Sequence, residues 1–146
     1  MANQVSHQTT LHVRDHCLCL ATQRAARALA RRFDKAFRPL GITSGQFSLL
    51  MSLNRPEPPP LSAVASLLAM DRTTLTANLK PLERRGLVET IRNPRDRRSR
   101  LLKLTDEGKA LLAQAAPVWK REHALVDAEI EAVSGEDLRA ALAEIV

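Results

Sequence analysis

The feature that most constrains the fold is a pair of short helical patterns separated only by the segment Ala69–Asp71. Residues 61–68 and residues 72–84 each place apolar side chains at spacings of three and four, which is the period of an amphipathic helix. Asp71 is a favoured N-cap residue, and Thr74 stands at the third position of the helix that it would begin. Two helices joined by so short a turn predict a helix-turn-helix.

Positive charge is concentrated in the second of these helices and the residues after it. Residues 72–103 hold ten basic and three acidic side chains, a net charge of +7, whereas the whole chain carries +6. Lysine and arginine side chains that neutralise phosphates release condensed counterions, so the expected partner of this segment is a polyanion. A surface that serves only solubility would normally mix both signs.

A two-stranded hairpin is expected after the second helix. Gly86 ends that helix, and residues 87–91 and 99–104 show short strand patterns joined by the arginine-rich residues 92–98. A basic hairpin beside a helix-turn-helix suits double-stranded DNA. The second helix fits the major groove, and arginines on the hairpin can enter the minor groove.

The predicted DNA contacts use a few kinds of chemistry. Threonine methyl groups can touch the thymine methyl group, asparagine can form two hydrogen bonds with adenine, and lysine or arginine can hold phosphates or guanine. An aspartate at the hairpin tip would orient a neighbouring arginine. The predicted contact residues are Arg72, Thr73, Thr74, Thr76, Ala77, Asn78, Lys80, Arg84, Arg92, Arg95, Asp96, Arg97, Arg98 and Arg100.

The N-terminal part of the chain is expected to be helical as well. A long amphipathic helix is predicted from about Arg14 to Leu40, with arginines on its polar side. A second helix should begin at Thr43, whose hydroxyl can form a capping box with Gln46. Residues 54–60, NRPEPPP, cannot hold a helix and are predicted to form a stiff connector.

The C-terminal part is expected to form two helices. Thr105 would cap the first, whose apolar stripe runs to Val133, and Ser134 would begin the second. Proline inside a helix removes a hydrogen bond, so we expect a bend or a loss of regularity at Pro81 and a kink at Pro117. These stripes lie outside the helix-turn-helix, and a compact lobe would not bury all of them. The sequence therefore predicts a dimer.

The central residues resemble a known family. The run LSAVASLLAMDRTTLTANLKPLERRGLVE, residues 61–89, followed by RNPRDRRSRLLKLTDEG, residues 92–108, is similar to the multiple antibiotic resistance regulator (MarR) family. Asp96 and Arg98 match the aspartate-x-arginine of the wing, and residues 104–108 match the Leu-Thr-x-x-Gly that begins the next helix. The resemblance implies a homodimer whose first and last helices interlock, with two winged lobes on successive major grooves. It also implies a small anionic or phenolic effector bound between lobe and dimer helices.

These inferences predict a mainly α fold: a winged helix-turn-helix with a two-stranded wing, whose N- and C-terminal helices form a dimerisation region. Residues 41–105 would be the DNA-binding lobe, and residues 1–40 and 106–146 the dimerisation helices. The predicted function is that of a ligand-responsive transcription regulator, a repressor with activation left open, which binds a pseudo-palindromic operator. An architectural nucleic-acid-binding protein without an effector is the main alternative.

The two cysteines and two nearby histidines raise further alternatives. Cys17 and Cys19 would lie on one helix and point to different sides. A disulfide between subunits or a sulfenic acid would make them a redox switch. The plainer interpretation is that both thiols are inert. His12 and His16, four residues apart, together with the adjacent Cys17 would be the ligands of a metal-dependent enzyme, the less favoured alternative. With so few ligands in view, no metal site is expected.

His123 and Trp119 are candidate effector contacts, although an interface histidine and a core tryptophan are the plainer interpretations. The sequence has no glycine-rich phosphate loop, nucleophile elbow or metalloprotease helix motif, so we expect neither an enzyme nor a cofactor. Residues 1–10 lack the pattern of an export signal, and no apolar run is long enough to span a membrane. The expected location is the cytoplasm.

Overall fold

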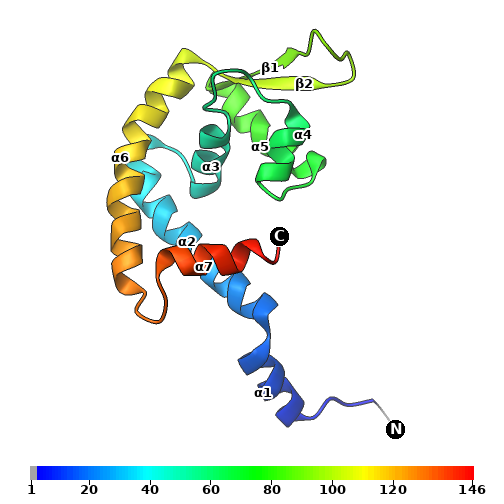
Figure 1. Cartoon of the computed structure of the whole chain (residues 1–146), viewed down its shortest axis with the longest axis vertical. Helices are drawn as coiled ribbons and strands as arrows, with labels where there is room; N and C mark the ends of the chain where they lie inside the picture. Colours follow the sequence, from blue (N-terminus) through cyan, green and yellow to red (C-terminus); the bar gives the residue numbers. More distant parts are fainter. Residues whose placement is uncertain (1–2) are drawn as a thin grey trace.

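Residues 3–146 are described in a computed structural model of the chain, which is mainly helical and has one two-stranded sheet at one end (Figure 1). The two strands pair antiparallel over their full length, from Val88 opposite Leu104 to Arg92 opposite Arg100. The elements are α1 (His7–His16), α2 (Leu18–Phe37), a 3-10 turn η1 (Arg38–Leu40), α3 (Ser44–Ser52), α4 (Leu61–Leu67), α5 (Arg72–Arg84), β1 (Val88–Arg92), β2 (Arg100–Leu104), α6 (Asp106–Glu129) and α7 (Gly135–Ala143).

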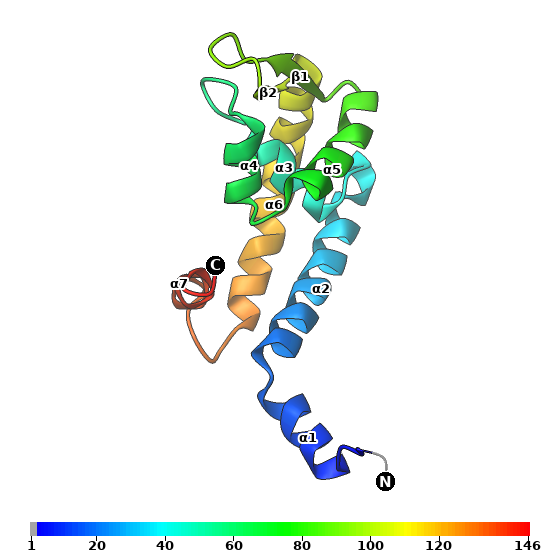
Figure 2. The ribbon, with the colours of Figure 1, turned by 90° about the vertical axis from the view of Figure 1, so that its right-hand side faces the viewer.

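The long helices α2 and α6 lie side by side and carry a lobe made of α3, α4, α5 and the hairpin at one end (Figures 1 and 2). One continuous apolar core joins the lobe to these helices. Phe37 of α2, Leu50 of α3, Leu75 of α5 and Leu102 of β2 are all fully buried in it. A winged helix-turn-helix held on two long helices is the architecture that the sequence predicts.

The helix starts follow the capping residues expected from the sequence. Thr43 and Gln46 form a reciprocal capping box at the start of α3. Asp71, Thr105 and Ser134 each accept a hydrogen bond from a backbone N–H in the first turn of α5, α6 and α7. Each cap satisfies a donor that has no partner inside its helix.

The expected single helix from Arg14 to Leu40 is wrong. The chain leaves helical geometry at Cys17, where φ is −78° and ψ is 111°, and this residue both ends α1 and caps α2. The Cys17 sulfur accepts the backbone N–H of Leu20 at 3.4 Å, so the thiol takes the part that a serine or aspartate plays at other N-caps. An apolar stripe can continue across such a break, which is why periodicity alone misses it.

Neither proline interrupts its helix, so the loss of regularity expected at Pro81 does not occur, while the bends expected at Pro81 and Pro117 stay predictions. α5 is continuous through Pro81, and α6 is continuous through Pro117. A proline removes only one backbone donor, and the rest of each helix is held by packing on the core. The predicted extension of α6 to Val133 is also wrong, because Ile130 adopts extended geometry directly after Glu129.

The proline-rich connector does more than span a gap. Its Pro59 carbonyl oxygen accepts the Leu102 N–H at 2.9 Å, and Pro60 pairs with Leu101 as an isolated bridge. Proline has a carbonyl group but no N–H, which suits the outer edge of a sheet. The connector therefore covers part of β2.

No helix within residues 3–146 is long and apolar enough to cross a membrane.

Candidate nucleic-acid interface

The exposed side of α5 carries short polar and basic side chains. Leu75, Leu79 and Leu82 are buried against the lobe, which fixes the orientation of the helix. An open hollow of about 350 Å³ lies on the solvent side, where predicted contact residues come together. Its lining is Arg72, Thr73, Thr76, Ala77 and Lys80.

Other predicted contacts on α5 already have partners within the protein. The Thr74 hydroxyl donates to the Asp71 carboxylate at 2.7 Å, so it belongs to the helix cap. Asp71 accepts hydrogen bonds from both the backbone and the side chain of Thr74, and these lower its pKa. The Asn78 amide lies 3.6 Å from the Met70 sulfur, on the side of α5 that faces α3. Thr74 and Asn78 therefore lie away from the hollow.

The hairpin holds its arginines on a short ordered loop. Asn93 accepts the backbone N–H of Arg95 at 3.0 Å, and Asp96 accepts the backbone N–H of Arg98 at 2.9 Å. Asp96 was expected to orient a neighbouring arginine side chain; its carboxylate accepts the Arg98 backbone N–H instead. Within residues 3–146 the Asp96 carboxylate forms no ion pair with a guanidinium.

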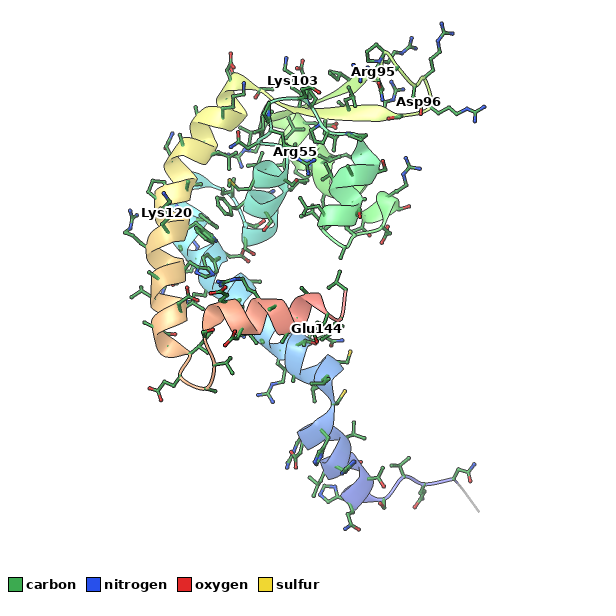
Figure 3. The ribbon with its side chains drawn as sticks, viewed as in Figure 1. Arg55, Arg95, Asp96, Lys103, Lys120 and Glu144 are labelled. Carbon is green, nitrogen blue, oxygen red and sulfur yellow. The ribbon has the colours of Figure 1, made fainter. Side chains whose placement is uncertain are left out.

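Figure 3 shows Arg95 and Asp96 at the free end of the hairpin, with Lys103 near the end that joins α6. Arg92, Arg97, Arg98 and Arg100 are exposed as well. Both views place the hairpin beside α4 and α5 on the same lobe (Figures 1 and 2). The basic hairpin and the exposed side of α5 are therefore neighbours in space as well as in sequence.

Comparison with known proteins identifies this arrangement. The family model described as the MarR family matches residues 42–99. The transcriptional regulator MosR of M. tuberculosis, solved in complex with DNA, is 35% identical; the match covers 89% of this chain and 93% of MosR, with a TM-score of 0.81. The chain belongs to the MarR family.

Two further relatives support this assignment. A cysteine-to-serine mutant of MarR from E. coli, complexed with operator DNA, is 26% identical, with coverage of 93% and 98% and a TM-score of 0.81. The organic hydroperoxide resistance transcriptional regulator of Bacillus subtilis (strain 168) is 28% identical over 118 residues, which are 81% of this chain and 78% of that protein. The matches to several other curated regulators span 50–60% of their length. These relatives are transcription regulators.

The MarR-type motif at residues 104–108 has a clear structural basis. The Thr105 hydroxyl donates to the Gly86 carbonyl oxygen at 2.6 Å and accepts the Gly108 N–H at 3.0 Å. A side chain at Gly108 would collide with the carbonyl oxygen of Leu87. Gly86 itself has a φ of 70°, which favours glycine. The motif therefore fastens the end of α5, the wing and the start of α6 together.

Some structurally important residues were not found by sequence reasoning. Arg32 of α2 forms an ion pair with Glu122 and a two-pronged pair with Glu129, both on α6. These pairs lower the pKa of Glu129 and raise that of Arg32. Arg85 donates to the Gly41 carbonyl oxygen at 2.6 Å, which ties the end of α5 to the turn before α3. In the sequence, the Arg32 ion pairs could have been suggested only by matching opposite charges on distant segments.

The candidate effector residues lie in an aromatic cluster between α6 and the neighbouring helices. The Trp119 and His123 rings are 4.7 Å apart, and each is near a phenylalanine of the core. His123 Nδ1 lies 3.2 Å from the Asp127 carboxylate, and Trp119 is 37% exposed. This places the pair where the lobe meets the long helices.

The N-terminal candidates are separated from the predicted DNA-contact residues. The rings of His12 and His16 stack at 4.2 Å, and His16 Nδ1 contacts the His12 carbonyl oxygen at 2.8 Å. Within residues 3–146 no three His, Cys, Asp or Glu side chains form a group that could hold a metal ion. The expectation that Cys17 and Cys19 share one helix is wrong, because Cys17 is at the break before α2 and Cys19 is in its first turn. The Cys19 thiol is exposed, and that of Cys17 is half-buried.

Proposed function

We propose that this MarR-family protein is a ligand-responsive repressor that binds a pseudo-palindromic DNA operator as a homodimer. The observation that carries the proposal is the placement of the basic hairpin beside the exposed side of α5 on one lobe. MosR and E. coli MarR, which share this fold, were solved with DNA. In this protein α5 would enter the major groove, and Arg95, Arg97 and Arg98 would enter the adjacent minor groove or hold its phosphates.

Structure favours some of the predicted base contacts over others. Thr73, Thr76 and Ala77 border the hollow on α5 and can approach the edges of bases, while Arg72, Lys80 and Arg84 suit phosphates or guanine. Thr74 instead stabilises the start of α5 through its hydrogen bonds to Asp71. A dimer with two-fold symmetry would place its two α5 helices about 34 Å apart, one turn of DNA.

Binding should be tested on genomic fragments selected for affinity and on random duplexes of equal length, by fluorescence anisotropy at two salt concentrations. The affinity of a specific regulator for its selected site exceeds its affinity for random DNA by about 10³-fold or more at physiological salt. Equal affinity for both would favour the architectural alternative. Loss of all binding at low ionic strength would contradict the proposal.

A small aromatic or phenolic anion is the proposed effector, bound next to Trp119 and His123. Trp119 is 37% exposed, and the His123 ring offers nitrogen atoms for hydrogen bonding. Since Trp119 is the only tryptophan in the chain, its fluorescence reports directly on this cluster. Titration with benzoate and 4-hydroxybenzoate should quench it and raise the melting temperature, by mass action on the folded dimer. His123→Ala should lose both the quenching and the rise in melting temperature, and Trp119→Phe, which has no tryptophan fluorescence, should lose the rise in melting temperature.

Oxidation of Cys17 and Cys19 is the second proposed input. The relative in Bacillus subtilis is named for organic hydroperoxide resistance, and the Cys17 sulfur here is the cap of α2. A hydroperoxide would oxidise one thiolate to a sulfenic acid and leave as the alcohol, and a second thiol would then form a disulfide with loss of water. Either product changes the cap at the α1–α2 break.

The test is treatment of the protein with tert-butyl hydroperoxide, followed by non-reducing electrophoresis and DNA-binding measurements. We expect weaker DNA binding that dithiothreitol reverses, and no such effect in Cys17→Ser. A bond between subunits would appear as a covalent dimer. Unchanged DNA affinity with fully oxidised thiols would rule out a switch.

A further inference from the structure

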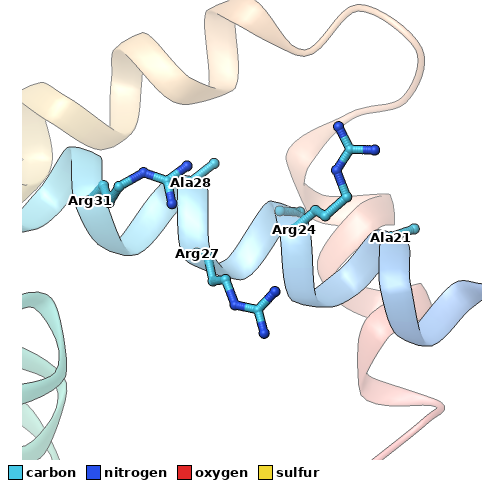
Figure 4. A pocket seen from close by; sticks show the side chains of 6 residues that line it. Ala21, Arg24, Arg27, Ala28 and Arg31 are labelled. Carbon is cyan, nitrogen blue, oxygen red and sulfur yellow. The ribbon is translucent and has the colours of Figure 1, made fainter.

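Three arginines of α2 border a groove that neither the proposed base contacts nor the proposed effector site uses. The groove is open to solvent and has a volume of about 570 Å³. Figure 4 shows Arg24 and Arg31 extending from one side of α2 and Arg27 from the other. Small alanine side chains lie between them. We call the six lining residues the arginine groove: Ala21, Arg24, Ala25, Arg27, Ala28 and Arg31.

The charge of the groove is not balanced within the subunit. All residues outside 72–103 carry a net charge of −1 together, but α2 alone carries +4. Among the residues that the structure describes, the three arginines of the groove have no carboxylate at ion-pair distance, whereas Arg32 pairs with Glu122 and Glu129. Like charges three and four residues apart on a helix repel one another. A bound polyanion would relieve this repulsion.

The groove faces away from the core. Arg24 is nine residues from the buried Phe33, which is about two and a half helical turns and therefore the opposite side of α2. Arg31 is turned from Phe33 by about 200°. Since the Phe33 ring lies 6.3 Å from that of His123 on α6, the arginines point away from α6. The hairpin also projects away from α6 (Figure 1), and Figure 2 views that side, with α2 in sight below α5.

The position of the groove along α2 suits the middle of a DNA operator. α2 runs from the lobe toward the end of the molecule that holds α7 (Figures 1 and 2). In the proposed dimer the two α5 helices occupy successive major grooves, and the minor groove between them faces the protein at the two-fold axis. The groove lies on the path from α5 to that axis. Arg24 and Arg31 are about 10.5 Å apart along the helix, a length of duplex that holds about six phosphates.

We propose that the arginine groove binds phosphates of the DNA backbone at the centre of the operator, between the two half-sites. This inference rests on the proposed binding of DNA by a homodimer, and it adds a contact separate from α5 and the wing. The guanidinium group suits phosphate because its planar donors can form two parallel hydrogen bonds. The alanine floor leaves room for the DNA backbone. Such contacts carry no base sequence, so they add affinity for any duplex that spans the dimer.

The test variant is Arg24→Gln with Arg31→Gln, which removes four positive charges per dimer and keeps polar side chains. If each arginine holds one phosphate, the slope of log K against log salt becomes less steep by about 3.6. Between 50 and 200 mM salt, wild-type affinity should therefore decline about 150-fold more than that of the variant. Fluorescence anisotropy with the selected fragment measures this. The matched control, Lys120→Gln with Arg121→Gln, removes the same charge from the exposed side of α6 and should leave the slope unchanged.

Neutral methylphosphonate linkages in the DNA show whether the contact is direct. Replacing the four central phosphates of the selected fragment should weaken wild-type binding about as much as the double arginine variant does. Combining the variant with this DNA should cause no further loss, because the same contacts are removed twice. Methylphosphonates at the outer ends of the fragment, where the wings would bind, should instead weaken wild type and variant equally.

The remaining outcomes separate this inference from the proposed function. An unchanged salt slope in the arginine variant, or additive losses with the central methylphosphonates, would overturn the inference while leaving DNA binding by α5 and the wing intact. Weaker dimerisation in sedimentation equilibrium, with unchanged DNA affinity per dimer, would also overturn it and assign the groove to a contact between subunits. Circular dichroism should show that each variant is folded. A wild-type protein that ignores DNA at low salt would contradict the proposed function itself.

Discussion

The strongest quantitative prediction concerns the loop of the wing. Arg97 and Arg98 are exposed, and the loop is shaped by hydrogen bonds to backbone groups, including the Arg98 N–H on Asp96. Replacing both arginines by alanine keeps that N–H and removes two positive charges per subunit. The double variant should therefore remain folded while it loses contacts to DNA.

The expected size of the effect follows from counterion release. If each arginine holds one phosphate on each of two subunits, the dimer loses four phosphate contacts, and the slope of log K against log salt becomes less steep by about 3.6. Between 50 and 200 mM salt, that difference amounts to a factor of about 150 in how strongly affinity declines. The loss should be similar for operator and random duplexes, because phosphate contacts carry little sequence information.

The assay is fluorescence anisotropy with a labelled duplex across this range of salt concentration. Lys120→Ala with Arg121→Ala removes the same charge from α6 and serves as the control. Figure 3 shows Lys120 on α6, away from the hairpin. An unchanged slope in the wing variant, or an equal change in the control, would refute the assignment of the wing. Thr76→Ala should behave differently and reduce the preference for the operator over random DNA.

Three further predictions concern stability. Gly108→Ala should lower the free energy of unfolding by about 1–3 kcal/mol in urea titrations, because its methyl group meets the Leu87 carbonyl oxygen; a gain from better helix propensity would contradict this. Leu102→Ala, which empties a fully buried site, should cost about 2–5 kcal/mol by the same measurement. Asp71 has a lowered pKa, so its charge stabilises the fold above the ordinary carboxyl pKa of about 3.9, and this contribution is lost as pH falls through the lower folded value. The melting-temperature difference between wild type and Asp71→Asn should therefore shrink on acidification, and a constant difference would exclude a role for the charge.

Local sequence signals predicted much of the fold. The capping residues Thr43, Asp71 and Thr105 and the positive-φ Gly86 mark the ends of elements, because each of them satisfies or frees backbone groups within a few residues. Strand positions followed from their turns and needed shifts of only one residue at some ends.

Features that depend on distant segments were not predictable in the same way. The ion pairs of Arg32 join residues about ninety positions apart, and the pairing of Pro59 with β2 needs the folded lobe. The same limit applies to the site. Composition identified Asn78 and Thr74 as suitable base readers, but only packing shows that Asn78 faces α3 and that Thr74 caps α5.

The joint at Thr105 explains how an effector near the long helices could act on DNA binding. β2 ends at Leu104 and α6 begins at Asp106, so only Thr105 separates the wing from the helix that carries Trp119 and His123. Its hydroxyl is bonded to Gly86 on one side and Gly108 on the other, so the joint has little freedom to flex. A ligand that changes the tilt of α6 must then reorient the wing, since packed helices move as units. For a dimer this would change the spacing of the two DNA-binding surfaces. Thr105→Ala should therefore weaken the coupling between ligand and DNA affinity more than it weakens either binding event alone, and equal losses would show that the joint only supports the fold.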